Sequence, residues 1–150
     1  MIFRGTFEYA LDAKHRLTVP VKYRPALAAG VVLAVSPETE AGSTRSLSIW
    51  PAEAYEAYVQ SALANVNPLL PQAREIRRAL FNNSWDLELD SANRLSIPAT
   101  AMAFAGLDRE VVITGSGDCL EVWDRKAHAE YNEGVLARLP EIVASFDHTD

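Results

Sequence analysis

Two short segments carry the side chains of this 150-residue chain that are most able to do chemistry. Asp12 and Arg16 bracket the first segment, and Asp90 and Arg94 bracket the second. A carboxylate can fix a turn by accepting hydrogen bonds from its amides, and a guanidinium can bind a carboxylate or a phosphate. The spacing alone is not diagnostic, because an acid and a base four residues apart are common as helical ion pairs.

The two segments are informative because the sequence around them occurs twice in the chain. Leu, Asp, Arg, Leu and Pro recur in one order at a constant offset of 78 residues (90 − 12), in LDAKHRLTVP at 11–20 and LDSANRLSIP at 89–98. Upstream of each copy apolar residues alternate with polar ones, and this period of two predicts a strand. Each copy therefore predicts a strand ending in an acid, a short turn, an arginine, a second strand and a proline.

The repeat continues beyond the prolines. A β-branched run at 31–35 corresponds to one at 111–114, and LSIW at 47–50 corresponds to LEVW at 120–123. The chain is therefore interpreted as a tandem duplication of a small strand-rich module. We divide it into a first module at 6–53, a helical connector at 54–82, a second module at 83–126, and a C-terminal helical segment with a polar tail at 127–150.

These motifs, with Phe3-Arg4-Gly5 at the start, make nearly the whole chain resemble the bacterial MraZ family. The resemblance implies an α+β, mainly β fold: two tandem swapped-hairpin modules of the SpoVT/AbrB type, related by a pseudo-two-fold axis, with a helical connector and C-terminal helices. It also implies a cytoplasmic, nucleoid-associated, sequence-specific transcriptional regulator of the division and cell-wall gene cluster. Such a protein would act as a ring-like homo-oligomer on repeated boxes of double-stranded DNA.

The residue before each motif arginine departs from the family pattern, which usually has glycine there. This chain has His15 and Asn93 at those positions. If the turns need a positive φ, asparagine is expected to fit at modest cost and histidine less well.

The charge of the chain is unevenly distributed. A net charge of −6 and a pI near 5.1 weigh against nucleic-acid binding. Residues 1–24, however, carry a local charge of +3 (5 − 2), whereas residues 84–100 carry −2 (1 − 3). DNA is therefore expected to be drawn to the first module. The candidate DNA-binding residues are Arg4, Lys14, Arg16, Arg24 and Arg94.

The two motif carboxylates, Asp12 and Asp90, are predicted to fix the turns. An alternative stays open for the motif arginines: Arg16 could form an internal ion pair with Asp12, or with Asp90 of the other module. Arg94, in the acidic module, could likewise be purely structural.

Other function classes have less support. The histidines at 15, 128 and 148 are scattered, and Gly115-Ser116-Gly117 lacks the strand, helix and Lys-Ser/Thr of a phosphate-binding loop. A single cysteine, Cys119, allows neither an internal disulfide nor a zinc cluster. We therefore expect no enzyme activity, cofactor, metal or small-molecule substrate. The longest apolar run, 26–35, is too short for the ~20 residues that span a membrane. An AbrB-like antitoxin and an oligomeric scaffold without DNA affinity remain alternatives.

Helices are predicted after both prolines, at 21–27 and 99–105. Two more are predicted at 51–66, which begins at the end of the first module and runs into the connector, and at 72–81 within the connector. Asp124 is expected to cap a C-terminal helix that Gly134 interrupts. Apolar stripes containing Tyr58, Val59 and Leu63, and Leu136, Leu139 and Val143, predict packing between subunits and a homo-oligomer larger than a dimer. The connector also carries a basic pair, Arg74 and Arg78, for which a solvated face or a subunit salt bridge is favoured over DNA contact.

Overall fold

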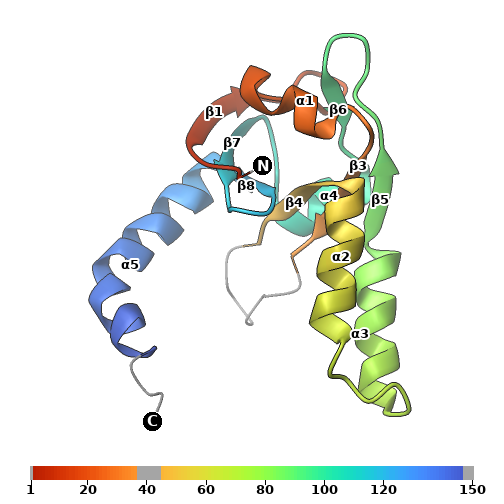
Figure 1. Ribbon diagram of the computed structural model, residues 1–150. Coiled ribbons are helices and arrows are strands. Elements are labelled where there is room, and N and C mark those ends of the chain that lie inside the picture. The colour runs from red at the N-terminus through yellow and green to blue at the C-terminus, as the bar shows by residue number, and fades with distance from the viewer. Residues whose placement is uncertain (1, 37–44, 147–150) are drawn as a thin grey trace.

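The computed structural model describes residues 2–36 and 45–146, and these form an α+β, mainly β fold, as expected (Figure 1). The strands are β1 (Thr6–Ala10), β2 (Arg16–Thr18), β3 (Val31–Val35), β4 (Leu47–Pro51), β5 (Ser84–Leu87), β6 (Arg94–Ser96), β7 (Glu110–Gly115) and β8 (Leu120–Asp124). The helices are η1 (Val21–Tyr23), α1 (Arg24–Leu27), α2 (Ala52–Leu63), α3 (Pro71–Asn82), α4 (Ala99–Ala105) and α5 (Arg125–Ala144).

The two halves of the chain exchange strands within one antiparallel sheet, whose order is β1-β7-β8-β4-β3-β5. The first strand of the first repeat pairs with the second half, where Phe7 lies opposite Ile113. The first strand of the second repeat pairs with the first half, where Trp85 lies opposite Leu33. This exchange is the swapped hairpin that the resemblance implies, and it places both Asp–x–x–x–Arg segments beside the same sheet.

The second strands of the two repeats, β2 and β6, form a separate antiparallel pair, which we call the ribbon. Leu17 lies opposite Leu95 at its centre, and both side chains are completely buried in the main core. Because successive strand residues point to opposite faces, the residues on either side of these leucines form the outer face of the ribbon. A hydrophobic centre thus fixes the orientation of a polar surface.

The core lies between the ribbon, the short helices and the sheet. Its largest completely or almost completely buried side chains include Phe3, Tyr23, Leu33, Ile49 and Ile113. The Tyr23 ring packs against Phe3, and its hydroxyl donates to the backbone oxygen of Arg4 and accepts from the Arg4 N–H. Tyr23 therefore ties the start of the chain to the helix that follows the ribbon.

The apolar stripe of α2 packs inside the chain, which corrects the expectation that it contacts another subunit. Val59 is 4% exposed and joins a second core cluster with Val32, Trp50 and Leu80, against which Tyr58 and Leu63 also pack. The helix α3 lies beside α2 in a hairpin (Figure 1). The connector supplies its own partner for the stripe, which periodicity could not show.

Helix α5 runs from Arg125 to Ala144 without a break, so the prediction of an interruption at Gly134 is wrong. A glycine inside a helix costs only about 1 kcal/mol relative to alanine, which a 20-residue helix tolerates. The predicted cap is confirmed, since Asp124 accepts a hydrogen bond from the Ala127 N–H. The helix extends away from the sheet on the opposite side from the α2–α3 hairpin (Figure 1).

Candidate nucleic-acid interface

Each motif aspartate holds a five-residue turn, which we call turn 1 (residues 12–16) and turn 2 (residues 90–94). The Asp12 Oδ1 accepts from the N–H groups of Lys14 and Arg16, each at 2.9 Å. In turn 2, Asp90 Oδ1 accepts from Ala92 and Arg94 at the same distances. The two turns therefore have the same backbone hydrogen bonds, and they differ in charge at the side chain two residues after the aspartate, which is Lys14 in turn 1 and Ala92 in turn 2.

Both turns require a left-handed residue before the arginine. His15 has φ 57° and Asn93 has φ 59°, and they are the only non-glycine residues with positive φ in the part of the chain that the structure describes. The resemblance led us to expect glycine at these two positions. Both turns adopt the left-handed conformation with a side chain there, an imidazole in turn 1 and a carboxamide in turn 2.

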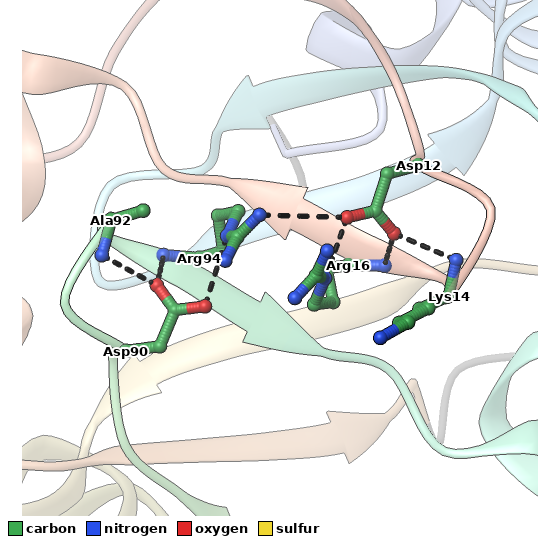
Figure 2. A network of polar contacts seen from close by, with 6 residues as sticks. All are labelled: Asp12, Lys14, Arg16, Asp90, Ala92 and Arg94. Carbon is green, nitrogen blue, oxygen red and sulfur yellow. Dashed lines mark hydrogen bonds and ion pairs between the residues drawn. The ribbon is translucent and has the colours of Figure 1, made fainter.

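The motif arginines are bound to carboxylates in both turns (Figure 2). The Nε of Arg16 lies 2.6 Å from Asp12 Oδ2, and the Nε of Arg94 lies 2.9 Å from Asp90 Oδ2. A longer contact of 3.8 Å joins Arg94 Nη1 to Asp12 Oδ2 across the two repeats. Of the two ion pairs considered for Arg16, the one with Asp12 forms, and the cross-repeat contact belongs to Arg94.

Hydrogen bonds hold the pKa of both aspartates below the ordinary value of 3.8. The largest cause is the N–H of Arg16 for Asp12 and the N–H of Arg94 for Asp90, while partial burial acts in the opposite direction. Both carboxylates are therefore ionised at neutral pH, and each neutralises one arginine. The positive charge that turn 1 has in excess comes from Lys14, whose counterpart in turn 2 is Ala92.

The outer face of the ribbon adds two hydroxyl groups that sequence reasoning missed. Arg16 lies opposite Ser96, and Thr18 lies opposite Arg94, so two arginines and two hydroxyls share one face. The alternation of these residues with Leu17 and Leu95 is visible in the sequence and could have predicted them. Arginine, serine and threonine side chains all donate hydrogen bonds to DNA phosphates.

Arg24 lies beside turn 2, although it comes from the first repeat. Its Nε donates to the Val19 carbonyl at 3.0 Å, and the Val19 N–H donates to the Asn93 carbonyl at 3.0 Å. The antiparallel ribbon causes this crossing, because the end of β2 meets the start of β6. The positively charged Arg24 of the first repeat therefore lies beside turn 2 of the more acidic second repeat.

Comparison with known proteins identifies the family. The family model described as "MraZ protein, putative antitoxin-like" matches residues 2–78 and 80–141. The chain belongs to the MraZ family. It is 36% identical to the "Transcriptional regulator MraZ" of Mycoplasmoides gallisepticum, over 97% of this chain and 98% of the relative. Two proteins of the same name are also similar to nearly the whole chain. The one from Corynebacterium diphtheriae is 36% identical over 97% of this chain and 96% of the relative. The one from a Nocardioides species is 35% identical over 99% of both chains.

Arg4, one of the five candidate DNA-binding residues, does not lie with the cations of turn 1. It precedes β1, whereas turn 1 follows that strand, and a five-residue strand spans roughly 13 Å between its end residues. Its backbone is held by Tyr23, and its side chain is exposed. The structure therefore brings together Lys14, Arg16 and Arg94, with Arg24 beside turn 2, and leaves Arg4 apart.

The motif carboxylates have little capacity for acid–base chemistry. Asp12 and Asp90 have lowered pKa values and are occupied by turn amides and arginines.

Other kinds of site were also considered. In the described residues, no group of three or more His, Cys, Asp or Glu side chains is placed to hold a metal ion. No helix of residues 2–36 and 45–146 is long and apolar enough to cross a membrane. Cys119 is a buried free thiol, and His148 lies outside the described residues.

Proposed function

We propose that the protein is a sequence-specific DNA-binding transcriptional regulator that contacts DNA through the outer face of the ribbon and its two turns. The observation that carries the proposal is the grouping of Arg16, Thr18, Arg94 and Ser96 on one face of a two-stranded ribbon. A ribbon of this kind fits the major groove of B-DNA. The regulators of the same name to which the chain is similar support this function.

The turns would prepare the arginines for binding. Because each Nε is held by a carboxylate, the guanidinium groups lose little conformational freedom when DNA arrives. In the described part of the chain, the Arg16 side chain donates a hydrogen bond only through Nε, so its terminal nitrogens can donate to a phosphate or to the O6 and N7 atoms of guanine. Arg94 is held by two carboxylates, and we expect it to contribute less.

Assembly would compensate for the acidic net charge. One ribbon neutralises only a few phosphates, because Asp12 and Asp90 offset its two arginines. Several ribbons on one oligomer would act together on repeated DNA boxes, which raises apparent affinity by roughly 10²–10⁴ when the spacing matches. We propose a ring of more than two copies for this reason.

The surfaces for such a ring lie on opposite sides of the subunit (Figure 1). One is the exposed apolar stripe of α5, made of Tyr131, Leu136, Leu139 and Val143, together with Phe146 just after the helix. The other is the end and outer side of α3, where Leu69, Leu70 and Phe81 are exposed beside Arg74, Arg77 and Arg78. We call these the α5 surface and the α3 surface.

The charges of the two surfaces are complementary. The α3 arginines have no ion-pair partner among the described residues. Beyond its first two residues, which are Arg125 and Lys126, helix α5 carries Glu130, Glu133 and Glu141 against one cation, Arg138. Two different surfaces that fit each other make a head-to-tail contact, which closes into a ring when the rotation allows it. We therefore propose that α5 of one copy docks on α3 of the next.

Footprinting on the DNA upstream of the protein's own gene, within the division and cell-wall gene cluster, tests the function. We expect several evenly spaced protected boxes, tight binding of multi-box duplexes, and weak binding of single boxes with a shallower salt dependence. Arg16→Ala should abolish the footprint, and Arg94→Ala should weaken it less. A protein that oligomerises but protects no DNA would be a scaffold, and protection only beside a toxin gene would indicate an antitoxin. We place the protein in the cytoplasm, at the nucleoid.

A further inference from the structure

An open groove of about 380 Å³ lies next to turn 1. One side of the groove is turn 1 and the residue before it, and the other side is the segment before β7, which contains Asp108 and Arg109. The Leu11 N–H donates to the Arg109 carbonyl at 2.8 Å and joins the two sides. Its lining residues are Leu11, Asp12, Ala13, His15, Asp108 and Arg109. Asp12 belongs both to this groove and to the network of arginines in Figure 2, so the groove is continuous with the ribbon's polar face.

Arg109 supplies the groove with a cation from the second repeat. Its side chain is exposed, and it forms no ion pair with any described residue, unlike Arg16, Arg94 and Arg125. The guanidinium is therefore available to an anion from outside the subunit. Asp108 is also exposed in the same wall and works against such an anion.

Turn 2 has no cation at the position equivalent to Arg109, although Arg24 lies beside this turn. Arg109 stands two residues before Val111, where β7 enters the core, and the residue two before Val31 of β3 is Ala29. Ala29 is exposed as well, so the difference is one of charge and not of burial. The two ends of the ribbon thus differ at this position as they differ at Lys14 and Ala92.

We propose that Arg109 binds a backbone phosphate of DNA, on the outer side of the box that the ribbon contacts. This inference rests on the proposed DNA-binding function and extends the interface beyond the motif. A guanidinium pairs well with a phosphate, and such a contact positions the protein on the duplex without reading its sequence. Each subunit would then hold the DNA at turn 1 through Lys14, Arg16 and Arg109, and more weakly at turn 2.

Salt titrations of Arg109→Ala on two duplexes test the inference: the DNA upstream of the protein's own gene, and a duplex of arbitrary sequence. Loss of one phosphate contact per engaged subunit should reduce the slope of log K against log salt by about 0.9 for each of them. Affinity should fall by a similar factor on both duplexes, because the contact is sequence-independent. Asp108→Asn should strengthen binding to both.

Two matched variants serve as controls. Arg45→Ala removes a charge elsewhere, where the guanidinium lies over the Phe104 ring, and should leave the slope unchanged. Ala29→Arg in the Arg109→Ala background places the cation beside turn 2 and should restore part of the slope. An unchanged slope in Arg109→Ala with intact wild-type binding would refute the Arg109 contact alone. If the wild-type protein binds neither duplex, the proposed function fails instead.

Discussion

The indole N–H of Trp123 donates a hydrogen bond to the hydroxyl of Thr114 at 3.2 Å. In the first half of the chain the corresponding tryptophan is Trp50, and the residue in the place of Thr114 is Ala34. Trp50 is 6% exposed, and no described residue accepts from its Nε1. A cavity of about 170 Å³ lies beside both Trp50 and Ala34.

Ala34→Thr should therefore stabilise the protein. A hydroxyl at this position can accept from Trp50 as Thr114 does from Trp123, and satisfying a buried donor is worth about 1 kcal/mol. Denaturant unfolding measures the gain. Ala34→Val is the control, because valine fills the same space without an acceptor. Equal stabilisation by both variants would show that filled volume, and not the hydrogen bond, is responsible.

The difference between Lys14 and Ala92 predicts opposite effects on DNA binding. Lys14→Ala should weaken binding and lower the salt slope by about 0.9 per engaged subunit, because one phosphate contact is lost. Ala92→Lys should strengthen binding and raise the slope, since turn 2 has the same backbone hydrogen bonds as turn 1. Titrations at several salt concentrations measure both. No gain in Ala92→Lys would mean that turn 2 faces away from DNA.

The two aspartates should differ in their contribution to stability. Asp12 contacts both motif arginines, whereas Asp90 contacts only Arg94, so Asp12→Asn should lower the melting temperature more than Asp90→Asn. Equal decreases in melting temperature would show that the 3.8 Å contact between Arg94 and Asp12 does not stabilise the fold.

The same pair of variants predicts a pH dependence. Because the folded pKa of each aspartate lies below 3.8, the ionised groups stabilise the fold fully above that pH, and this contribution is lost as the pH falls through the lowered folded value. The gap in melting temperature between wild type and Asp12→Asn should therefore be constant from neutral pH to about pH 5 and close in stronger acid. A gap that persists in acid would assign the effect of the variant to shape and not to charge.

Complementary assembly variants test the head-to-tail contact. Leu139→Asp disables the α5 surface, and Arg74→Glu with Arg78→Glu disables the α3 surface, while neither touches the core. Each variant alone should be monomeric by light scattering coupled to gel filtration. Their mixture should give a heterodimer, because one intact α5 surface meets one intact α3 surface. Variants that remain monomeric when mixed would exclude this pairing of surfaces.

Much of the fold could be predicted from the sequence, because the repeat and the alternation are local patterns. The strand exchange came only from the resemblance, since alternation identifies strands but does not select their partners. Positions that depend on that exchange were therefore missed: Arg24 beside turn 2 and Arg109 beside turn 1 are both brought there by the other half of the chain. The α2 stripe was assigned to a subunit contact for a different reason: periodicity shows that a helix has an apolar face but not which residues cover it, and its partners Val32 and Leu80 are distant in sequence.

The strand exchange makes the chain a dimer of its own halves, joined by the α2–α3 hairpin. Cutting the exposed loop between those helices would not release two domains, because β1 would still be paired with β7 and β5 with β3. The nicked protein would stay one body until the sheet itself unfolds. The covalent link therefore sets which two halves meet, and the interlocked sheet keeps them together. Gene duplication and fusion would in this way have joined two modules permanently. Because the two halves are then encoded separately, turn 1 and turn 2 at the two ends of the ribbon can differ in charge.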